Sequence, residues 1–246
     1  MLRAGSHERN ASVRQSRVTA PSRDAELKLL RQQLLTLGAK VEAGVAAAIR
    51  ALLERDPALA RELIYADAEV DQLELQVDET CRRLLVLRHS RIDMRFITTA
   101  VKVVVDLERI GDLAVNIARQ AIDLDPIPPL RPRHDLPKLA DLCQRQVRMA
   151  LAAFAGADVV RAQKVILNDE LVDARYHALF NELIGLMMED PANIRSGNGM
   201  LFVAKHLERI ADHAVNVAEM VVFLVKGKDI RHPGSRGFES HAAAGG

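Results

Sequence analysis

Two stretches of twelve residues, LERIGDLAVNIA at 107–118 and LERIADHAVNVA at 207–218, carry the strongest structural signal in this chain. Nine of the twelve positions are identical, and the two copies lie 100 residues apart. A second repeated pattern, Asp-x-x-Val-Asp, precedes each copy, at 67–71 in the first half and at 169–173 in the second. The same two acidic motifs occur in the same order in each half, which predicts an internal duplication.

Helical periodicity runs almost without interruption outward from these motifs, and proline and glycine mark its breaks. Asp56-Pro57 and Asp190-Pro191 are typical helix starts, because Asp caps a first turn in which Pro is tolerated. A proline cluster at 126–132 separates the halves. These signals predict six helices, at about 25–54, 57–88, 91–124, 135–155, 158–189 and 198–226.

Short links make sequential helices antiparallel neighbours, so each half is expected to form a three-helix bundle. The predicted fold class is therefore all-α, with two tandem three-helix bundles related by internal duplication. The expected organisation is a flexible basic N-terminal arm at 1–24, a first bundle at 25–125, a proline-rich linker at 126–134, a second bundle at 135–226 and a flexible C-terminal tail at 227–246.

The composition agrees with close-packed helices and argues against several classes of protein. Of the 246 residues, 49% are hydrophobic but only 3% are aromatic, so the core is built from aliphatic side chains. A net charge of +1 argues against a nucleic-acid-binding protein, which would carry a basic excess. Two cysteines are too few for a disulfide framework or a zinc site and indicate free thiols in a reducing cytosol. No apolar run approaches the ~20 residues that cross a bilayer.

The repeated motifs place carboxylates among apolar residues. At about 100° per residue, Glu108 and Asp112 share a helical stripe with Val101, Val104 and Val115, and the second copy repeats this arrangement. We expect these stripes to face the bundle interior. Two carboxylates one turn apart project the same way, so four converge where a second acidic helix packs against the first.

Four half-buried anions cannot all stay ionised unaided, because desolvation and mutual repulsion oppose their charge. A multivalent cation removes both costs, and oxygen ligands favour iron, manganese or magnesium, with zinc as a further candidate. We therefore expect one metal site in each half. The expected ligands are Asp67, Asp71, Glu108 and Asp112 in the first half and Asp169, Asp173, Glu208 and Asp212 in the second, supported by Asn116 and Asn216.

Two other interpretations of the acidic motifs stay open. Acidic pairs four residues apart are usually solvated or paired with arginine, and Arg109 and Arg209 stand beside these pairs, so the chain could be a helical scaffold with no ion. The alternative from another class is a carboxylate-bridged metalloenzyme, an oxidase or a phosphatase. The Glu-x-x-His pairs of di-iron oxidases, phosphate-binding loops and nucleophile elbows are all absent from the sequence, so we expect no enzymatic activity.

LERIGD at 107–112, LERIAD at 207–212 and the acidic helices before them resemble the PhoU family of phosphate-transport regulators, from about Asp24 to His232. The resemblance implies a cytoplasmic, dimeric accessory protein that negatively regulates phosphate uptake and the phosphate-starvation two-component response. It implies two partners, the ATPase of the phosphate ABC transporter and the phosphate-sensing histidine kinase, and membrane association only through them. It also implies iron or another ion at the doubled acidic motif. The link at 88–93 departs from that family by lacking the expected proline.

Overall fold

The structure is a computed structural model that describes residues 22–130 and 135–231. Its elements are α1 (Arg23–Glu54), α2 (Pro57–Leu85), α3 (Arg91–Leu124), α4 (Asp135–Gly156), α5 (Val159–Glu189), the short 3₁₀ helix η1 (Pro191–Asn193) and α6 (Ile194–Lys226). All six predicted helices are present, and the largest shift is at α6, which begins four residues earlier than expected. Among the described residues, none of these helices combines the length and apolarity needed to span a bilayer.

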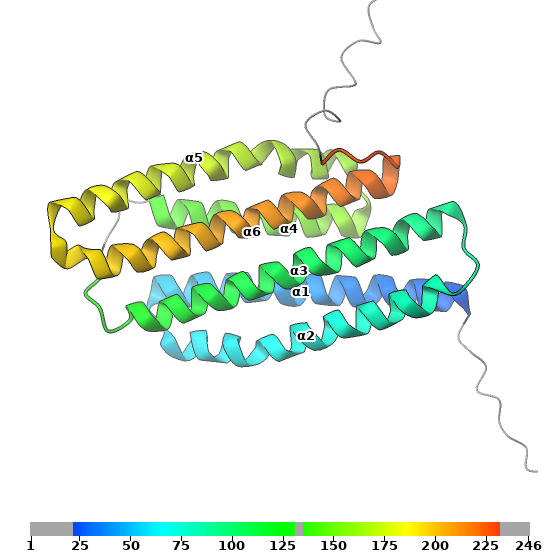
Figure 1. The fold of residues 1–246 in the computed structure, drawn as a ribbon, viewed down its shortest axis with the longest axis horizontal. Coiled ribbons are helices and arrows are strands. Elements are labelled where there is room, and N and C mark those ends of the chain that lie inside the picture. The colour runs from blue at the N-terminus through cyan, green and yellow to red at the C-terminus, as the bar shows by residue number, and fades with distance from the viewer. Residues whose placement is uncertain (1–21, 131–134, 232–246) are drawn as a thin grey trace, which may run out of the picture.

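The helices form two halves of three. The first three pack against one another, as do the last three, and the halves meet where α3 contacts α6 and α1 contacts α4. In Figure 1, α2 and α5 lie on opposite outer sides of the molecule, with α3 and α6 between them. The chain directions of α3 and α6 are antiparallel, since Arg95 contacts the backbone of Leu224 while Asp106 contacts His213. The all-α fold predicted from the repeat is confirmed.

Local capping fixes the helix starts where the sequence signals placed them. The Asp56 side chain accepts hydrogen bonds from the backbone N–H groups of Ala58 and Leu59 at the start of α2. Ser90 and Asp93 form a reciprocal capping box at the start of α3. In the link at 88–93, which lacks the expected proline, this side-chain cap therefore marks the start of α3.

Small residues allow the two halves to approach closely. A Cβ atom at Gly38 of α1 would lie 2.8 Å from Leu151 Cδ2 of α4, and one at Gly199 of α6 would lie 2.8 Å from Leu124 Cδ2 of α3. Both distances are shorter than ordinary carbon contacts. Larger side chains at these positions would therefore push against the opposite half.

The predicted flexible ends are described only in part. Helix α1 begins at Arg23, so the last residues of the predicted arm are helical. In the predicted tail, Ile230 packs against the core and Asp229 pairs with Arg231. Residues 227–231 of the predicted tail thus include one partly buried apolar side chain and one ion pair. The remaining arm and tail residues (1–21 and 232–246), and residues 131–134 of the linker, lie outside the described residues.

Candidate functional site

The acidic motifs of neighbouring helices come together in both halves. Burial raises the pKa of Asp67 on α2, and the carboxylates of Asp71 and of Asp112 on α3 raise it further. In the second half, burial raises the pKa of Asp212 on α6, and Glu208 and Asp173 add to that effect. The carboxylates that act on Asp67 and on Asp212 from the adjacent helix therefore lie close to them in space.

These carboxylates lie at the edge of the core and not inside it. The Glu108 side chain is 20% exposed and that of Asp112 is 42% exposed. Val101, on the same stripe, is itself 40% exposed, whereas Leu107 and Ile110 are buried. Val104 and Val115 on the same stripe are buried, so the acidic stripe runs along the edge of the buried face of α3 instead of lying in its middle. Helix α3 contacts α1, α2 and α6 together, so its buried face is centred away from the acidic stripe.

The first half carries a longer row of acidic groups than expected. Glu74 and Asp78 continue the row of Asp67 and Asp71 along α2. Burial raises the pKa of Glu74, and Asp78 and Asp71 raise it further. We call these groups the first acidic strip: Asp67, Asp71, Glu74, Asp78, Glu108 and Asp112. Glu74 is not among the ligands expected from the sequence, although its spacing of seven residues from Asp67 was a usable signal.

The glycine of LERIGD lies where α2 contacts α3 at this strip. A Cβ atom at Gly111 would lie 3.4 Å from Val70 Cγ1 and 3.9 Å from Asp67 Oδ1. The Asp67 carboxylate therefore lies beside the backbone of α3. The motif of α3 and the acidic row of α2 are therefore in direct contact at this position.

Arginine lies among the first acidic strip. Arg109 Nη1 is 3.2 Å from Asp112 Oδ2, and Arg109 Nε is 3.4 Å from Glu108 Oε2. Burial raises the pKa of Glu108, the charge of Asp112 raises it further, and Arg109 opposes both effects. The excess negative charge of this strip is therefore only partly neutralised from within the chain.

The second acidic strip, which consists of Asp169, Asp173, Glu208 and Asp212, includes a cation of its own. Lys205 Nζ lies 2.8 Å and 2.6 Å from the two carboxylate oxygens of Glu208. The same ammonium lies 5.4 Å from the centre of the Tyr176 ring. In the first half, Val105 and Glu74 occupy the equivalent positions of Lys205 and Tyr176. The duplicated motifs therefore build two strips of different charge.

The donor chemistry of the strips suits a hard cation, but the side chains do not surround a common point. In the described part of the chain, no three His, Cys, Asp or Glu side chains are placed to share a metal ion. The predicted supporting amides contact other groups, since Asn116 Oδ1 accepts from Arg119 Nη1 and Asn216 Nδ2 donates to Asp106 Oδ1, each at 3.0 Å. A coordination shell would require the carboxylates to turn toward each other.

A polar cluster joins the two halves between the strips. Asp106 of α3 accepts the hydrogen bond from Asn216 of α6, and His213 Nδ1 lies 2.9 Å from the same oxygen. Asp106 precedes Glu108 by two residues, and His213 follows Asp212 directly. This cluster therefore connects the helices that carry the two strips. Asp106 is not among the site residues expected from the sequence.

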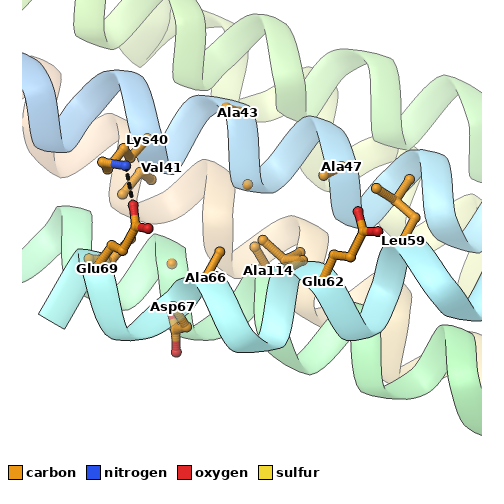
Figure 2. Close-up of a pocket in the computed structure, with 14 residues that line it drawn as sticks. Lys40, Val41, Ala43, Ala47, Leu59, Glu62, Ala66, Asp67, Glu69 and Ala114 are labelled. Atoms are coloured by element: carbon orange, nitrogen blue, oxygen red, sulfur yellow. Dashed lines mark hydrogen bonds and ion pairs between the residues drawn. The ribbon is translucent and has the colours of Figure 1, made fainter.

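A separate apolar groove lies between α1 and α2 and encloses a cavity of about 290 Å³. Figure 2 shows Lys40 and Glu69 meeting across this groove, while Asp67 points away from it on the other side of α2. Asp67 thus belongs to the acidic strip, although its backbone borders the groove. Small residues form much of the lining, namely Ala43, Gly44, Ala47, Ala66, Gly111 and Ala114.

The fold and the strips together define a class: a duplicated all-α protein in which each half presents carboxylates from two adjacent helices. The family model of the PhoU domain matches the chain twice, over residues 34–121 and 136–221. This chain belongs to the PhoU family. The resemblance suggested by the two LERI motifs is thereby confirmed.

Named relatives and solved structures agree with this assignment. The chain is 40% identical over 217 residues to a phosphate-specific transport system accessory protein PhoU homolog of Pseudomonas putida, covering 86% of this chain and 83% of the relative. It is 35% identical to the phosphate-specific transport system accessory protein PhoU of Escherichia coli, and the match covers 86% of this chain and 88% of the relative. The crystal structure of PhoU from Pseudomonas aeruginosa superposes with a TM-score of 0.81 at 39% identity, covering 84% of this chain and all of that one. The crystal structure of the phosphate transport system regulatory protein PhoU from Streptococcus pneumoniae gives a TM-score of 0.79 at 31% identity. The match covers 86% of this chain and 100% of that chain.

Proposed function

We propose that this chain is an accessory protein of phosphate transport that regulates phosphate homeostasis. The observation that carries the proposal is the doubled PhoU domain, together with relatives named as accessory proteins of the phosphate-specific transport system over most of their length. The absence of catalytic motifs from the sequence agrees with a regulatory role.

The proposal includes the direction of control and the partners. The chain acts negatively, reducing uptake by the phosphate ABC transporter and silencing the phosphate-starvation two-component response when phosphate is plentiful. Its partners are the transporter ATPase and the phosphate-sensing histidine kinase, and it works as a homodimer in the cytoplasm. The family resemblance supports each of these points.

The proposal also gives the acidic strips a cation-binding role. A bound divalent or trivalent ion would supply the positive charge that these carboxylates lack. Neighbouring carboxylates of the first strip raise the pKa values of Asp67, Glu74 and Glu108, which is the electrostatic state that a cation relieves. Arg109 would have to release Asp112 for that carboxylate to join such a site. In the second strip, the ion pair of Lys205 with Glu208 already supplies part of that positive charge.

Phosphate-replete growth of a deletion strain tests the regulatory function. Constitutive phosphate uptake and starvation-gene expression are expected in the deletion strain, with repression restored by the wild-type chain. Normal repression in the deletion strain would contradict the proposal.

The cation-binding role needs a separate measurement on the purified protein. Glu108→Gln with Asp112→Asn removes two charges of the first strip, and Glu208→Gln with Asp212→Asn does the same in the second. Bound metal and the melting temperature are compared with and without chelator. Loss of metal in the first variant would support the role, whereas unchanged metal content in both variants would refute the site without touching the regulatory function.

A further inference from the structure

The turn between α2 and α3 exposes apolar side chains at one end of the molecule. Leu85, Val86 and Leu87 are consecutive and are 50%, 83% and 41% exposed, and Ile92 across the turn is 74% exposed. A run of three exposed apolar residues is costly in water unless something covers it. We call residues 82–95 the arginine turn. Figure 1 shows it at the far end of the long axis, where α2 meets α3.

Hydrogen bonds hold the arginine turn in one shape. The backbone N–H of Leu87 donates to the carbonyl oxygen of Leu84 at 2.9 Å, and the His89 ring contacts the same oxygen. The Ser90–Asp93 capping box closes the other side. The apolar side chains are therefore presented on a closed turn at the junction of two long helices.

The charge of the turn selects an anionic partner. Residues 82–95 contain five arginines and a single acidic residue. Arg88 and Arg91, which flank the tip, are exposed and form no ion pair with any described residue. The C-terminal end of α6 lies nearby, because Arg95 contacts its last carbonyl groups, and it adds the exposed Lys226 and Lys228.

The duplication supplies an internal comparison. The equivalent turn between α5 and α6, residues 184–197, has one arginine and two acidic residues, and it lies at the opposite end of the molecule. Met188, which corresponds to Val86, is 81% exposed, and Ile194 at the start of α6 is 53% exposed. Both turns therefore expose apolar side chains, but only the α2–α3 turn surrounds them with positive charge.

We propose that the arginine turn docks directly on an anionic lipid bilayer. An apolar apex inserts among the acyl chains while arginines around it contact lipid phosphates, and this combination gives stable attachment where neither part alone does. The turn lies at one end of the long axis, beside the start of α1, where Arg23 Nη1 is 3.6 Å from Asp93 Oδ2. This contact departs from the expectation that membrane association occurs only through partners, and it does not depend on the proposed function.

Flotation of the full-length protein with vesicles tests the proposal. Binding is expected to vesicles of phosphatidylcholine mixed with phosphatidylglycerol, to be much weaker to phosphatidylcholine alone, and to fall as salt is added. Each basic residue near an anionic surface strengthens binding about fivefold, so Arg88→Gln with Arg91→Gln is expected to weaken binding about 25-fold.

The apolar contribution is tested by Val86→Asp with Ile92→Asp, which is expected to abolish binding. The matched control is Met188→Asp with Ile194→Asp in the other turn, which is expected to bind like the wild type. All four side chains are exposed, so circular dichroism should show intact helices in both variants.

Three outcomes would overturn the proposal. The first is a wild-type protein that does not float with anionic vesicles. The second is wild-type binding by the arginine or the Val86–Ile92 variant, which would assign binding to another part of the chain. The third is loss of self-association by the Val86–Ile92 variant in sedimentation without any vesicle binding by the wild type, which would show that a second copy covers the turn.

Discussion

Replacing Gly111 with alanine is expected to stabilise the protein. Gly111 lies inside α3, and the second copy of the motif has Ala211 at the equivalent position. The added Cβ would meet Val70 Cγ1 at 3.4 Å and Asp67 Oδ1 at 3.9 Å, which are ordinary van der Waals distances. Glycine inside a helix costs roughly 0.5–1 kcal/mol relative to alanine, because its unfolded chain has more freedom to lose.

The expected gain is therefore about 1 kcal/mol in the free energy of unfolding. For a chain of this size, that gain corresponds to a rise of about 2–4 °C in melting temperature. Differential scanning calorimetry and urea denaturation should both show it. The measurements are made with chelator present, so that an ion bound near Asp67 does not contribute.

The same substitution at Gly227 provides a control of opposite sign. Gly227 ends α6 in the left-handed conformation with φ of 70°, and its Cβ would lie 2.9 Å from the guanidinium carbon of Arg95. Gly227→Ala is expected to lower the free energy of unfolding by about 1–2 kcal/mol. A lower melting temperature for Gly111→Ala would refute the reasoning, since α2 would then have to press more closely on α3 than these distances show.

Three further predictions concern the polar sites and the thiols. Lys205→Val places in the second half the residue that Val105 provides in the first. It is expected to strengthen Mn²⁺ binding, measured by titration calorimetry, by up to about fivefold, and the effect is modest because the lysine is exposed. An unchanged affinity would contradict this prediction. Asp106→Ala removes the carboxylate partner of His213 and should lower the free energy of unfolding, measured by urea denaturation, by about 1–3 kcal/mol. An unchanged free energy of unfolding would show that the inter-bundle cluster does not contribute to stability. Burial raises the pKa of Cys81 to about 11 and raises that of Cys143 further, so the thiolate fraction of Cys81 is about one in a thousand at pH 8. Both thiols should react with a disulfide reagent only on unfolding, and rapid labelling of the native protein would be inconsistent with the burial.

The helices and the duplication could be predicted because their signals are local. Asp56 before Pro57 caps α2, and the proline cluster after α3 divides the halves, through contacts within a few residues of chain. The repeated LERI motifs showed the relation between the halves without any distance being known. Facing carboxylates also followed from sequence, since helix geometry sets which side chains share a stripe.

The burial of those carboxylates was decided only by the tertiary structure. A stripe can be drawn on α3 from its sequence, but the centre of its buried face depends on how α6 packs beside α1 and α2. The same packing brings Asp106 to His213 from more than 100 residues away. The sequence by itself determined six helices in two repeated halves with acidic motifs in each. Only the packing of the halves decided that the strips lie at the core edge and differ in charge, because exposure and ion pairing depend on neighbours distant in the chain.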